Sequence, residues 1–440
     1  MLTYCKWLLL ALHILEKQLL CQSHAYILSR LTPRSLRKDN TRYMKQPVDR
    51  SLLLHFLAIA FINALLFFSS QFYGTSLPIH LHNISGSDTI VGICTALGTV
   101  ATLISRPFTG IAVDRIGRAP VLFIGALCIA LAFGANAIFH SVTAVIIIRF
   151  LYGFAGGAST TASNTIAADL IPRDRFGEWM GYFTLSQSFS MAIAPSIALS
   201  VMEASGFSVL MITAAGLVGI IMLLSFFFRQ KAVKISGKQP FMPYERSALR
   251  PALLMLIAGI GLGATFSFSI LFGRSMNFAH VGAYFTFFAA TLFVGRPLVG
   301  RIIDRYGSRS VLLFGFVGFA VSMIMLWQAK WEWLFLLSAA LSGVTYGAIQ
   351  NSLQTMAVIS APPERRGAAN ATYFTGFDAG LGFGSLVAGV LAKSLGYAAM
   401  FGLFSIPMLI GAVVYLLTEK KIAKMADSSV QVIEIADAEA

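Results

Sequence analysis

The chain carries an isolated carboxyl group deep inside an apolar run. Asp378 lies near the middle of residues 367–392. Other acidic residues of the apolar runs lie near the ends of their runs, among them Asp169, Glu178 and Glu203. A carboxyl group in a low-dielectric environment can bind and release a proton, or contact a cationic substrate. The alternative is a structural carboxyl that is hydrogen-bonded between helices.

A second charge that costs free energy to bury in a membrane is that of Arg149. It lies inside the apolar run 142–168, close to the end of the run that is predicted to face the outer side. A guanidinium group at this depth must pair, face water or extend to the membrane surface. We expect Arg149 to face a cavity near the path of a proton or substrate, where a planar group with several donors is useful. Extension to the outer surface is the alternative.

A charged turn between two apolar runs occurs twice. Residues 105–125 are SRPFTGIAVDRIGRAPVLFIG, and residues 295–315, which lie 190 positions later, are GRPLVGRIIDRYGSRSVLLFG. Nine of the 21 aligned positions are identical. The same offset aligns Gly153, Gly157, Pro172, Arg175 and Gly177 with Gly343, Gly347, Pro362, Arg365 and Gly367. A register that holds in loops as well as in apolar runs indicates an internal duplication.

The repeated turn has residues that suit a gate. Asp114 can pair with Arg115 or Arg118, or face the N-terminus of a helix from the other half, where an anion is favoured. Such a contact could hold one conformation and break in another; a charge cluster that sets topology and never breaks is the alternative. Glycines suit tight turns and close helix approach. We therefore assign gating to Gly110, Asp114, Arg115, Gly117, Arg118, Gly300, Asp304, Arg305 and Gly307.

The elements that carry these residues are predicted membrane helices. Apolar residues make up 57% of the chain and charged residues 12%, whereas a soluble domain has about 25% charged residues. The apolar runs have the length that spans a bilayer. They cover 51–74, 89–109, 119–139, 142–168, 178–202, 206–228, 251–272, 279–300, 310–329, 333–356, 367–392 and 396–418. The predicted fold is an all-α membrane protein with twelve transmembrane helices in two pseudo-symmetric six-helix bundles.

These spans divide the chain into five parts. Residues 1–50 form an N-terminal cytoplasmic extension, and residues 51–228 and 251–418 form the two bundles. A cytoplasmic linker covers 229–250, and a cytoplasmic tail covers 419–440. We expect residues 1–43 to be dispensable for transport, because no complete span or strong motif lies there.

Basic residues gather in the loops on one side of the predicted membrane. With an even number of spans both termini lie on this side, and we count Arg106 and Arg296 among its loop charges. The opposite loops offer Arg274, Lys330 and Lys393. The positive-inside rule then predicts a multi-pass protein of the inner (plasma) membrane with both termini in the cytoplasm. Because topology explains the net charge of +14, we expect no nucleic acid as a partner.

The charged turn resembles the signature between spans two and three of the major facilitator superfamily, and its second copy lies between spans eight and nine. Residues 149–157, RFLYGFAGG, are similar to a motif of proton-coupled members of that family. Residues 190–198 are similar to the glycine-proline motif of drug–proton antiporters, with Ser190, Ala194 and Ala198 in place of glycines. The resemblance implies this fold and a transport function like that of the twelve-span drug/proton antiporter branch.

The resemblance also implies a central cavity that is lined by spans one, four, seven and ten. Polar side chains on the spans are candidates for its wall, although each could instead join helices by hydrogen bonds. The candidates are Asn63, Asn164, Gln187, Gln350 and Asn351.

These features favour a secondary active transporter that works by alternating access, with proton-coupled efflux of a small molecule as the first expectation. A proton-coupled nutrient uptake symporter is the alternative, and the buried acid and both gating motifs disfavour a sensor that does not transport. The chain has no GxxxxGK[ST] phosphate loop and no metal-binding spacing, so we expect no enzyme, cofactor or metal. The expected partners are a small-molecule substrate, protons and the lipid bilayer, and we expect a monomer.

Overall fold

The computed structural model describes residues 50–172, 175–228 and 244–438, which are helical apart from short connections and contain no strand. Helices are the form that the apolar runs require, because a backbone in lipid must satisfy its hydrogen bonds within the segment. The predicted N-terminal extension, apart from its last residue, and most of the predicted linker lie outside the described residues.

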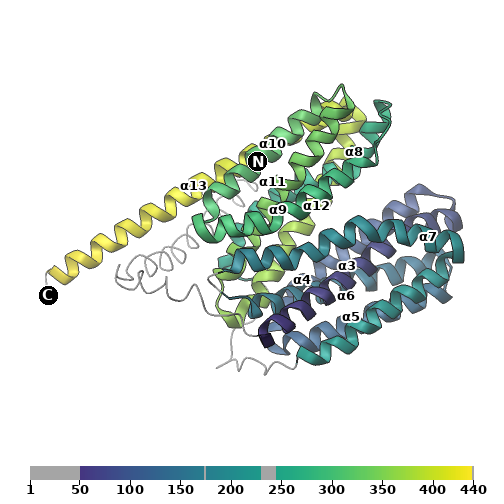
Figure 1. The fold of residues 1–440 in the computed structure, drawn as a ribbon, viewed down its shortest axis with the longest axis horizontal. Helices are drawn as coiled ribbons and strands as arrows, with labels where there is room; N and C mark the ends of the chain where they lie inside the picture. The colour runs from purple at the N-terminus through teal and green to yellow at the C-terminus, as the bar shows by residue number, and fades with distance from the viewer. Residues whose placement is uncertain (1–49, 173–174, 229–243, 439–440) are drawn as a thin grey trace, which may run out of the picture.

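The first half of the chain forms a bundle of long helices (Figure 1). They are α3 (Arg50–Ser85), α4 (Asp88–Arg115), α5 (Arg118–Ile138), α6 (Val142–Leu170) and α7 (Phe176–Ser225), followed by the short η2 (Phe226–Phe228).

Helix α7 contains two of the predicted spans. Gly206 breaks it, with φ 81° and ψ 171°, a conformation that glycine adopts without steric cost. Eleven helical segments among the described residues are long and apolar enough to cross a membrane, and one of them, Ile197–Ser225, lies in α7 and includes Gly206. The part of α7 before Gly206 provides the twelfth predicted crossing, so the predicted fold is confirmed.

The second half forms an equivalent bundle. It contains η3 (Arg246–Ala248), α8 (Leu249–Ser275), α9 (Ala283–Tyr306), α10 (Ser308–Trp327), α11 (Glu332–Ile359), η4 (Pro363–Arg365), α12 (Arg366–Leu395) and α13 (Tyr397–Ala438). Helix α13 continues past the predicted span 396–418 through most of the predicted tail, and its last part extends beyond the bundle (Figure 1).

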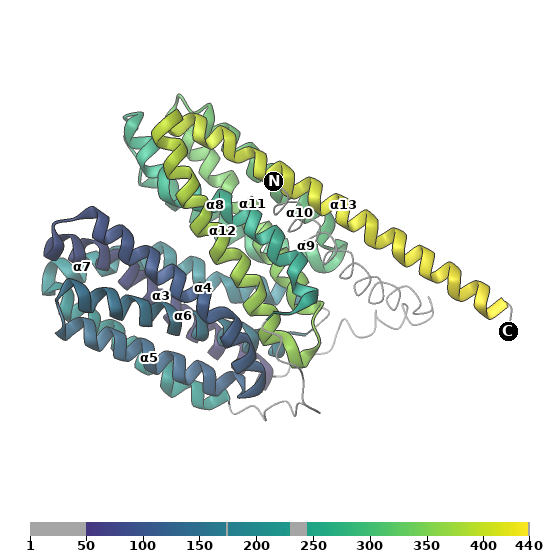
Figure 2. The ribbon, with the colours of Figure 1, turned by 180° about the vertical axis from the view of Figure 1, so that it is seen from behind.

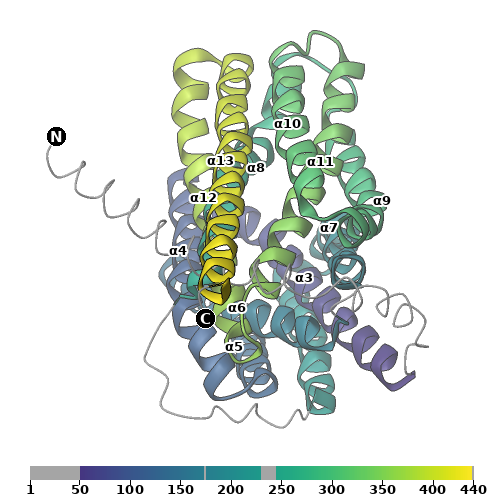
Figure 3. The same cartoon turned by 90° about the vertical axis from the view of Figure 1, so that its left-hand side faces the viewer.

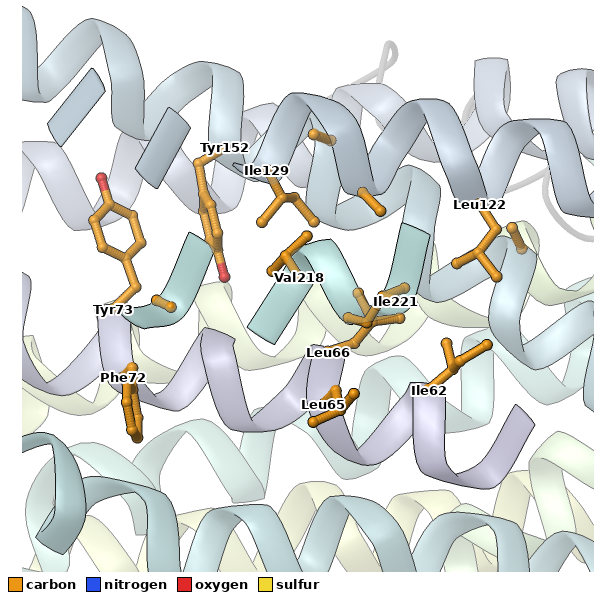
Figure 4. Packing of buried hydrophobic residues seen from close by; sticks show 14 of the residues in the cluster. Ile62, Leu65, Leu66, Phe72, Tyr73, Leu122, Ile129, Tyr152, Val218 and Ile221 are labelled. Carbon is orange, nitrogen blue, oxygen red and sulfur yellow. The ribbon is translucent and has the colours of Figure 1, made fainter. Parts of the chain in front are cut away.

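Each bundle has its own apolar core. In the first bundle, buried Leu66 of α3 packs towards Ile221 of α7 (Figure 4). In the second, the ring of Phe272 lies 6.2 Å from that of Phe335 and 5.8 Å from that of Phe401, measured between centroids. Separate cores allow each bundle to move as a unit relative to the other.

The two bundles meet along two helix pairs: α4 packs against α12, and α7 packs against α9 (Figure 3). Figures 1 and 2 show that the bundles converge at one end and diverge at the other. We call the converging end the linker side, because α7 ends and α8 begins there.

Glycines permit the close approach in both pairs. A Cβ atom at Gly110 of α4 would lie 2.8 Å from the Cβ of Ala371 in α12. A Cβ atom at Gly300 of α9 would lie 2.3 Å from the carbonyl oxygen of Gly177 in α7. Both distances are below van der Waals contact, so any larger side chain would push the bundles apart.

Candidate functional site

An ion pair joins the two bundles where α4 meets α12. The Nε of Arg106 donates to Oδ2 of Asp378 at 2.9 Å. A terminal nitrogen of Arg106 also donates to the carbonyl oxygen of Gly157 at 3.1 Å, and to the hydroxyls of Thr160 and Thr161 at 2.9 Å each. Asp378, predicted as an isolated acid, is therefore paired with a base from the other half.

This ion pair is shielded from solvent. The exposed fractions of the side chains are 5% for Arg106 and 13% for Asp378. The guanidinium carbon of Arg106 lies 4.7 Å from the ring centroid of Phe374, which covers it from the α12 side. Opposite charges attract more strongly in such surroundings than in water, and each is costly without the other.

Arg106 lies within a helix, so its prediction as a loop charge is wrong. Helix α4 continues to Arg115, so Arg106 lies about two and a half turns before the helix end. One sequence signal could have identified its role: the duplication repeats this arginine as Arg296, inside another apolar run.

Arg296 of α9 is the counterpart of Arg106, and it is likewise buried, with 3% of its surface exposed. One terminal nitrogen donates to the carbonyl oxygen of Thr184 in α7, and the other donates to Oε1 of Gln350 at 2.7 Å. These two partners are neutral. The position that corresponds to Asp378 in the first half is Ser188, which has no carboxylate.

On the linker side, Asp114 contacts the start of α12. Its two carboxylate oxygens accept hydrogen bonds from the backbone N–H groups of Gly367 and Ala368, both at 2.9 Å. A helix N-terminus carries unpaired N–H groups and a partial positive charge, so this position favours an anion. Of the predicted arrangements for Asp114, the structure therefore shows the contact with a helix of the other half.

Arg118 instead pairs with Asp169, at the end of α6. The Nε of Arg118 lies 2.8 Å from Oδ2 of Asp169, and Oδ1 of Asp169 accepts from Arg366 of α12 at 2.9 Å. Arg118 also donates to the carbonyl oxygen of Pro363 at 3.1 Å. Asp169 therefore links one arginine from each half, a role that its position near a span end did not reveal.

The α7–α9 pair has a smaller charge cluster on the same side. Glu178 of α7 accepts from Arg301 of α9 at 2.7 Å and from Arg175 at 2.7 Å. Both arginines are largely exposed. Exposed ion pairs contribute less than buried ones, because water screens their charges.

The other predicted gating residues lie at the turns. Gly117 and Gly307 have φ values of 113° and 80° and separate consecutive helices. Arg115 and Arg305 are exposed. The side chain of Asp304 lies outside the described part of the structure.

Two predicted cavity residues lie where the bundles face each other. The Oδ1 of Asn164 in α6 accepts from Nε2 of Gln354 in α11 at 2.8 Å. These two positions correspond in the duplication, so the bond joins equivalent points of the two halves. Asn351 donates to the carbonyl oxygen of Gly177 at 3.3 Å, which adds another contact between the halves.

The remaining cavity candidates serve their own bundles. Asn63 donates to the hydroxyl of Ser186 at 2.7 Å within the first bundle, and Gln350 binds Arg296 within the second. Gln187 is buried and makes no hydrogen bond within the part of the chain that the structure describes.

Arg149 lies apart from the Arg106–Asp378 pair. Its guanidinium carbon is 5.0 Å from the ring centroid of Tyr73 and 5.5 Å from that of Tyr152. Its Nε is buried without a hydrogen-bond partner in the described ranges. The two predicted intramembrane charges are therefore not brought together, and aromatic faces hold Arg149 by cation–π contact.

No group of three or more His, Cys, Asp or Glu side chains among the described residues could hold a metal ion. The polar contacts form a set of inter-bundle ties that are concentrated towards the linker side. These ion pairs and hydrogen bonds can break and form again when the two bundles rock relative to each other.

Comparison with known families agrees with the fold. The Major Facilitator Superfamily matches residues 59–279 and 252–432 of this chain. The chain belongs to the Major Facilitator Superfamily. It is thus a multi-pass membrane protein and a secondary transporter of small molecules, not an enzyme.

Curated relatives cover most of the chain. An uncharacterized MFS-type transporter, STM4428 of Salmonella typhimurium, is 26% identical over 350 residues, which cover 77% of this chain and 89% of the relative. The uncharacterized MFS-type transporter YhhS of Escherichia coli is 23% identical, covering 76% and 86%. The staphylopine export protein of Staphylococcus aureus is 20% identical, covering 79% and 91%.

Solved structures share the fold at low sequence identity. The human organic anion transporter MFSD10 matches with a TM-score of 0.71 and 17% identity, covering 84% of this chain and 100% of that chain. A bacterial homologue of the iron transporter ferroportin, in an outward-facing state, matches with a TM-score of 0.68 and 14% identity, covering 83% and 99%.

Proposed function

We propose that this transporter exports a small molecule in exchange for protons, and that Asp378 carries the proton. The observation behind the proposal is the Arg106–Asp378 ion pair, which joins α4 to α12 inside the membrane-spanning part. Asp378 is the acid of this contact, and its partner comes from the other half. A proton on Asp378 therefore acts directly on a tie between the bundles.

Protonation of Asp378 removes the negative charge that Arg106 faces. Arg106 then retains only neutral oxygen partners, those of Gly157, Thr160 and Thr161. Losing one member of a buried ion pair is costly, so the closed arrangement of α4 and α12 is weakened. The contacts of Asp114 with Gly367 and of Asp169 with Arg366 also join the first bundle to the start of α12, and in this proposal they open together with the ion pair.

The effect of protonation on the linker side favours exchange of substrate for protons. The state with the linker side closed holds Asp378 ionised, so a proton that arrives from the opposite side opens the linker side. Release of that proton restores the ion pair and closes the linker side around a bound substrate. With the linker side in the cytoplasm, as the basic loops predict, protons move inward and substrate moves outward.

Uptake by symport on the same scaffold is the second candidate, because a protonated Asp378 could also admit a substrate that travels with the proton. The direction of flux separates the two. In everted vesicles, an inward-acid pH gradient should drive accumulation of substrate if the chain is an exporter. Loss of substrate from vesicles under the same gradient would favour the symporter.

Asp378→Asn tests the proton site. Asparagine keeps the shape and most hydrogen bonds but cannot titrate, so pH-driven accumulation should fail while exchange between two sides at equal pH persists. A matched control is Gln354→Leu, which removes an inter-bundle hydrogen bond without removing a titratable group and should keep pH-driven accumulation. Full pH-driven accumulation by Asp378→Asn would refute the proposal.

A further inference from the structure

A cavity of about 760 Å³ lies between the bundles, away from the linker side. Its walls come from both halves: Gln71 of α3, Ser188 and Phe189 of α7, Phe266 of α8 and Thr286 of α9. The residue Gly282, which precedes α9 at that end, also lines it. Most of the wall belongs to α7 and α9, and neither Asn164 nor Gln354, which join the two halves elsewhere, lines the cavity.

Aromatic side chains dominate the wall. Four phenylalanines line the cavity: Phe189, Phe266, Phe285 and Phe293. The rings of Phe266 and Phe285 are already packed edge to face, with centroids 5.6 Å apart. No Asp, Glu, Lys, Arg or His belongs to the lining. Such a wall favours a ring system, and a charged ligand would lose its hydration without gaining a counter-charge.

The same wall offers unpaired polar groups. The hydroxyl of Ser188 is buried, with 3% of the residue exposed, and it has no hydrogen-bond partner among the described residues. The carboxamide of Gln71 and the hydroxyl of Thr286 also make no hydrogen bond in the described part of the chain. Buried polar groups are normally paired, so the Ser188 hydroxyl in particular lacks a partner within the described ranges. Gln71 is half-buried and Thr286 is exposed at the cavity, and together the three can bind hydroxyl, carbonyl or amine groups of a ligand.

The duplication relates this cavity to the proposed proton site. Ser188 occupies in α7 the position of Asp378 in α12, and Arg296 occupies in α9 the position of Arg106 in α4. At the first contact a carboxylate fills the space opposite the arginine. At the second, Arg296 is satisfied by Thr184 and Gln350, which leaves the small Ser188 at the cavity wall.

We infer that this cavity binds an uncharged aromatic amphiphile, whose rings pack on the phenylalanines and whose few polar groups pair with Gln71, Ser188 and Thr286. Its volume lies within the range of roughly 300–1,000 Å³ that is usual for small-molecule pockets. Phe189 and Phe293 are about half exposed at its edge, so the ligand reaches the cavity from the bilayer side. The inference names the substrate class for the proposed export, on which it rests.

Binding of a neutral probe to the full chain in lipid nanodiscs tests this inference. The probe is N-phenyl-1-naphthylamine, an uncharged diaryl amine whose fluorescence rises in apolar sites; its anionic relative 8-anilino-1-naphthalenesulfonate is the charge control. We expect saturable binding of the neutral probe, after subtraction of empty nanodiscs, and at least tenfold weaker binding of the sulfonate. Equal affinity for the two probes would overturn the inference.

Two variants locate the binding. Thr286→Trp fills the cavity and should weaken binding of the neutral probe at least tenfold, and Gln71→Leu should weaken it severalfold by removing a polar partner. The matched control is Ala96→Trp, at the exposed position of α4 that corresponds to Thr286, and it should bind like the unmodified chain. Identical affinities for Thr286→Trp and Ala96→Trp would overturn the inference.

A membrane lipid is the competing occupant. Bound lipid is measured by extracting the purified chain and the Thr286→Trp variant. The inference would also be overturned if the chain released one bound lipid that Thr286→Trp lacks and the neutral probe showed no saturable binding. Binding is measured without a pH gradient, so it is independent of proton coupling. If the neutral probe does not bind but pH-driven flux is intact, only the substrate class is contradicted. If the probe binds and Asp378→Asn keeps full pH-driven flux, only the proton site is contradicted.

Discussion

The α4–α12 and α7–α9 contacts occupy corresponding positions in the two halves, but their side chains differ. Both use glycines for close approach, at Gly110 in one contact and Gly300 in the other, and both bury an arginine at the same position. The arginine of α4 faces a carboxylate, whereas that of α9 faces a carbonyl oxygen and a carboxamide.

The difference shows how a duplicated scaffold can separate two tasks. Duplication supplies the same backbone approach twice, which both contacts need for rocking. Ionisable groups are concentrated at and beside α4–α12, where Asp114 and Asp378 form contacts between the halves and Asp169 of the adjacent α6 pairs with Arg366 of α12. The α7–α9 contact instead has an apolar cavity with unpaired hydroxyl and amide groups. Under the proposed function and the further inference, the first contact responds to protons and the second binds the ligand.

The largest difference in stability between the α4–α12 and α7–α9 contacts is expected when the buried arginine of each is removed. Arg106→Leu leaves Asp378 as an unpaired buried charge, so stability should fall by about 3–5 kcal/mol. Arg296→Leu leaves only neutral groups unpaired, and the loss should be about 1–3 kcal/mol. Denaturant or thermal unfolding of the purified protein measures both.

The double variant Arg106→Leu/Asp378→Leu is the control, because it removes both charges together. It should recover much of the stability that Arg106→Leu loses. Equal losses for the two single arginine variants would show that the two contacts do not differ electrostatically.

A smaller difference is expected from the repeated aspartates. Asp114→Ala removes an acceptor for two N–H groups at the start of α12, which is worth about 1–2 kcal/mol. Transport should fall roughly tenfold, since about 1.4 kcal/mol changes an equilibrium tenfold. Asp304→Ala should have a milder effect, because the second copy has Ser308 in the place of Arg118.

Transport assays on both aspartate variants, corrected for the amount of inserted protein, check this ranking. Wild-type turnover by Asp114→Ala would show that the linker-side contact does not gate. An effect of Asp304→Ala as large as that of Asp114→Ala would remove the proposed asymmetry from the linker side.

Substitution of the turn glycines is expected to destabilise the two halves equally. Gly117 and Gly307 both have positive φ values, so Gly117→Ala and Gly307→Ala should each cost about 1–2 kcal/mol of stability. Paired unfolding measurements check whether the losses match. Clearly unequal losses would show that the two copies differ in backbone conformation as well as in side chains.

The sequence predicted the surroundings of some residues better than their partners. Asp114 was predicted to be able to face a helix N-terminus of the other half, because its charge and place at a span end suit that contact. Asp378 was predicted from depth alone, without its partner. Arg106 was wrongly counted among loop charges although it lies within the predicted run 89–109, because the count assigned arginines near a span end to the adjoining loop.

The sequence by itself determined the number of crossings, the duplication and the family, because each depends on local apolar length or on a repeated register. Only the tertiary structure decided which groups meet. Arg106 and Asp378 are separated by 272 positions, and Asn164 and Gln354 by 190. Such pairs form only when the two bundles approach at a particular angle. The cavity between α7 and α9 follows from the same approach, because its wall combines residues of both halves that no local pattern connects.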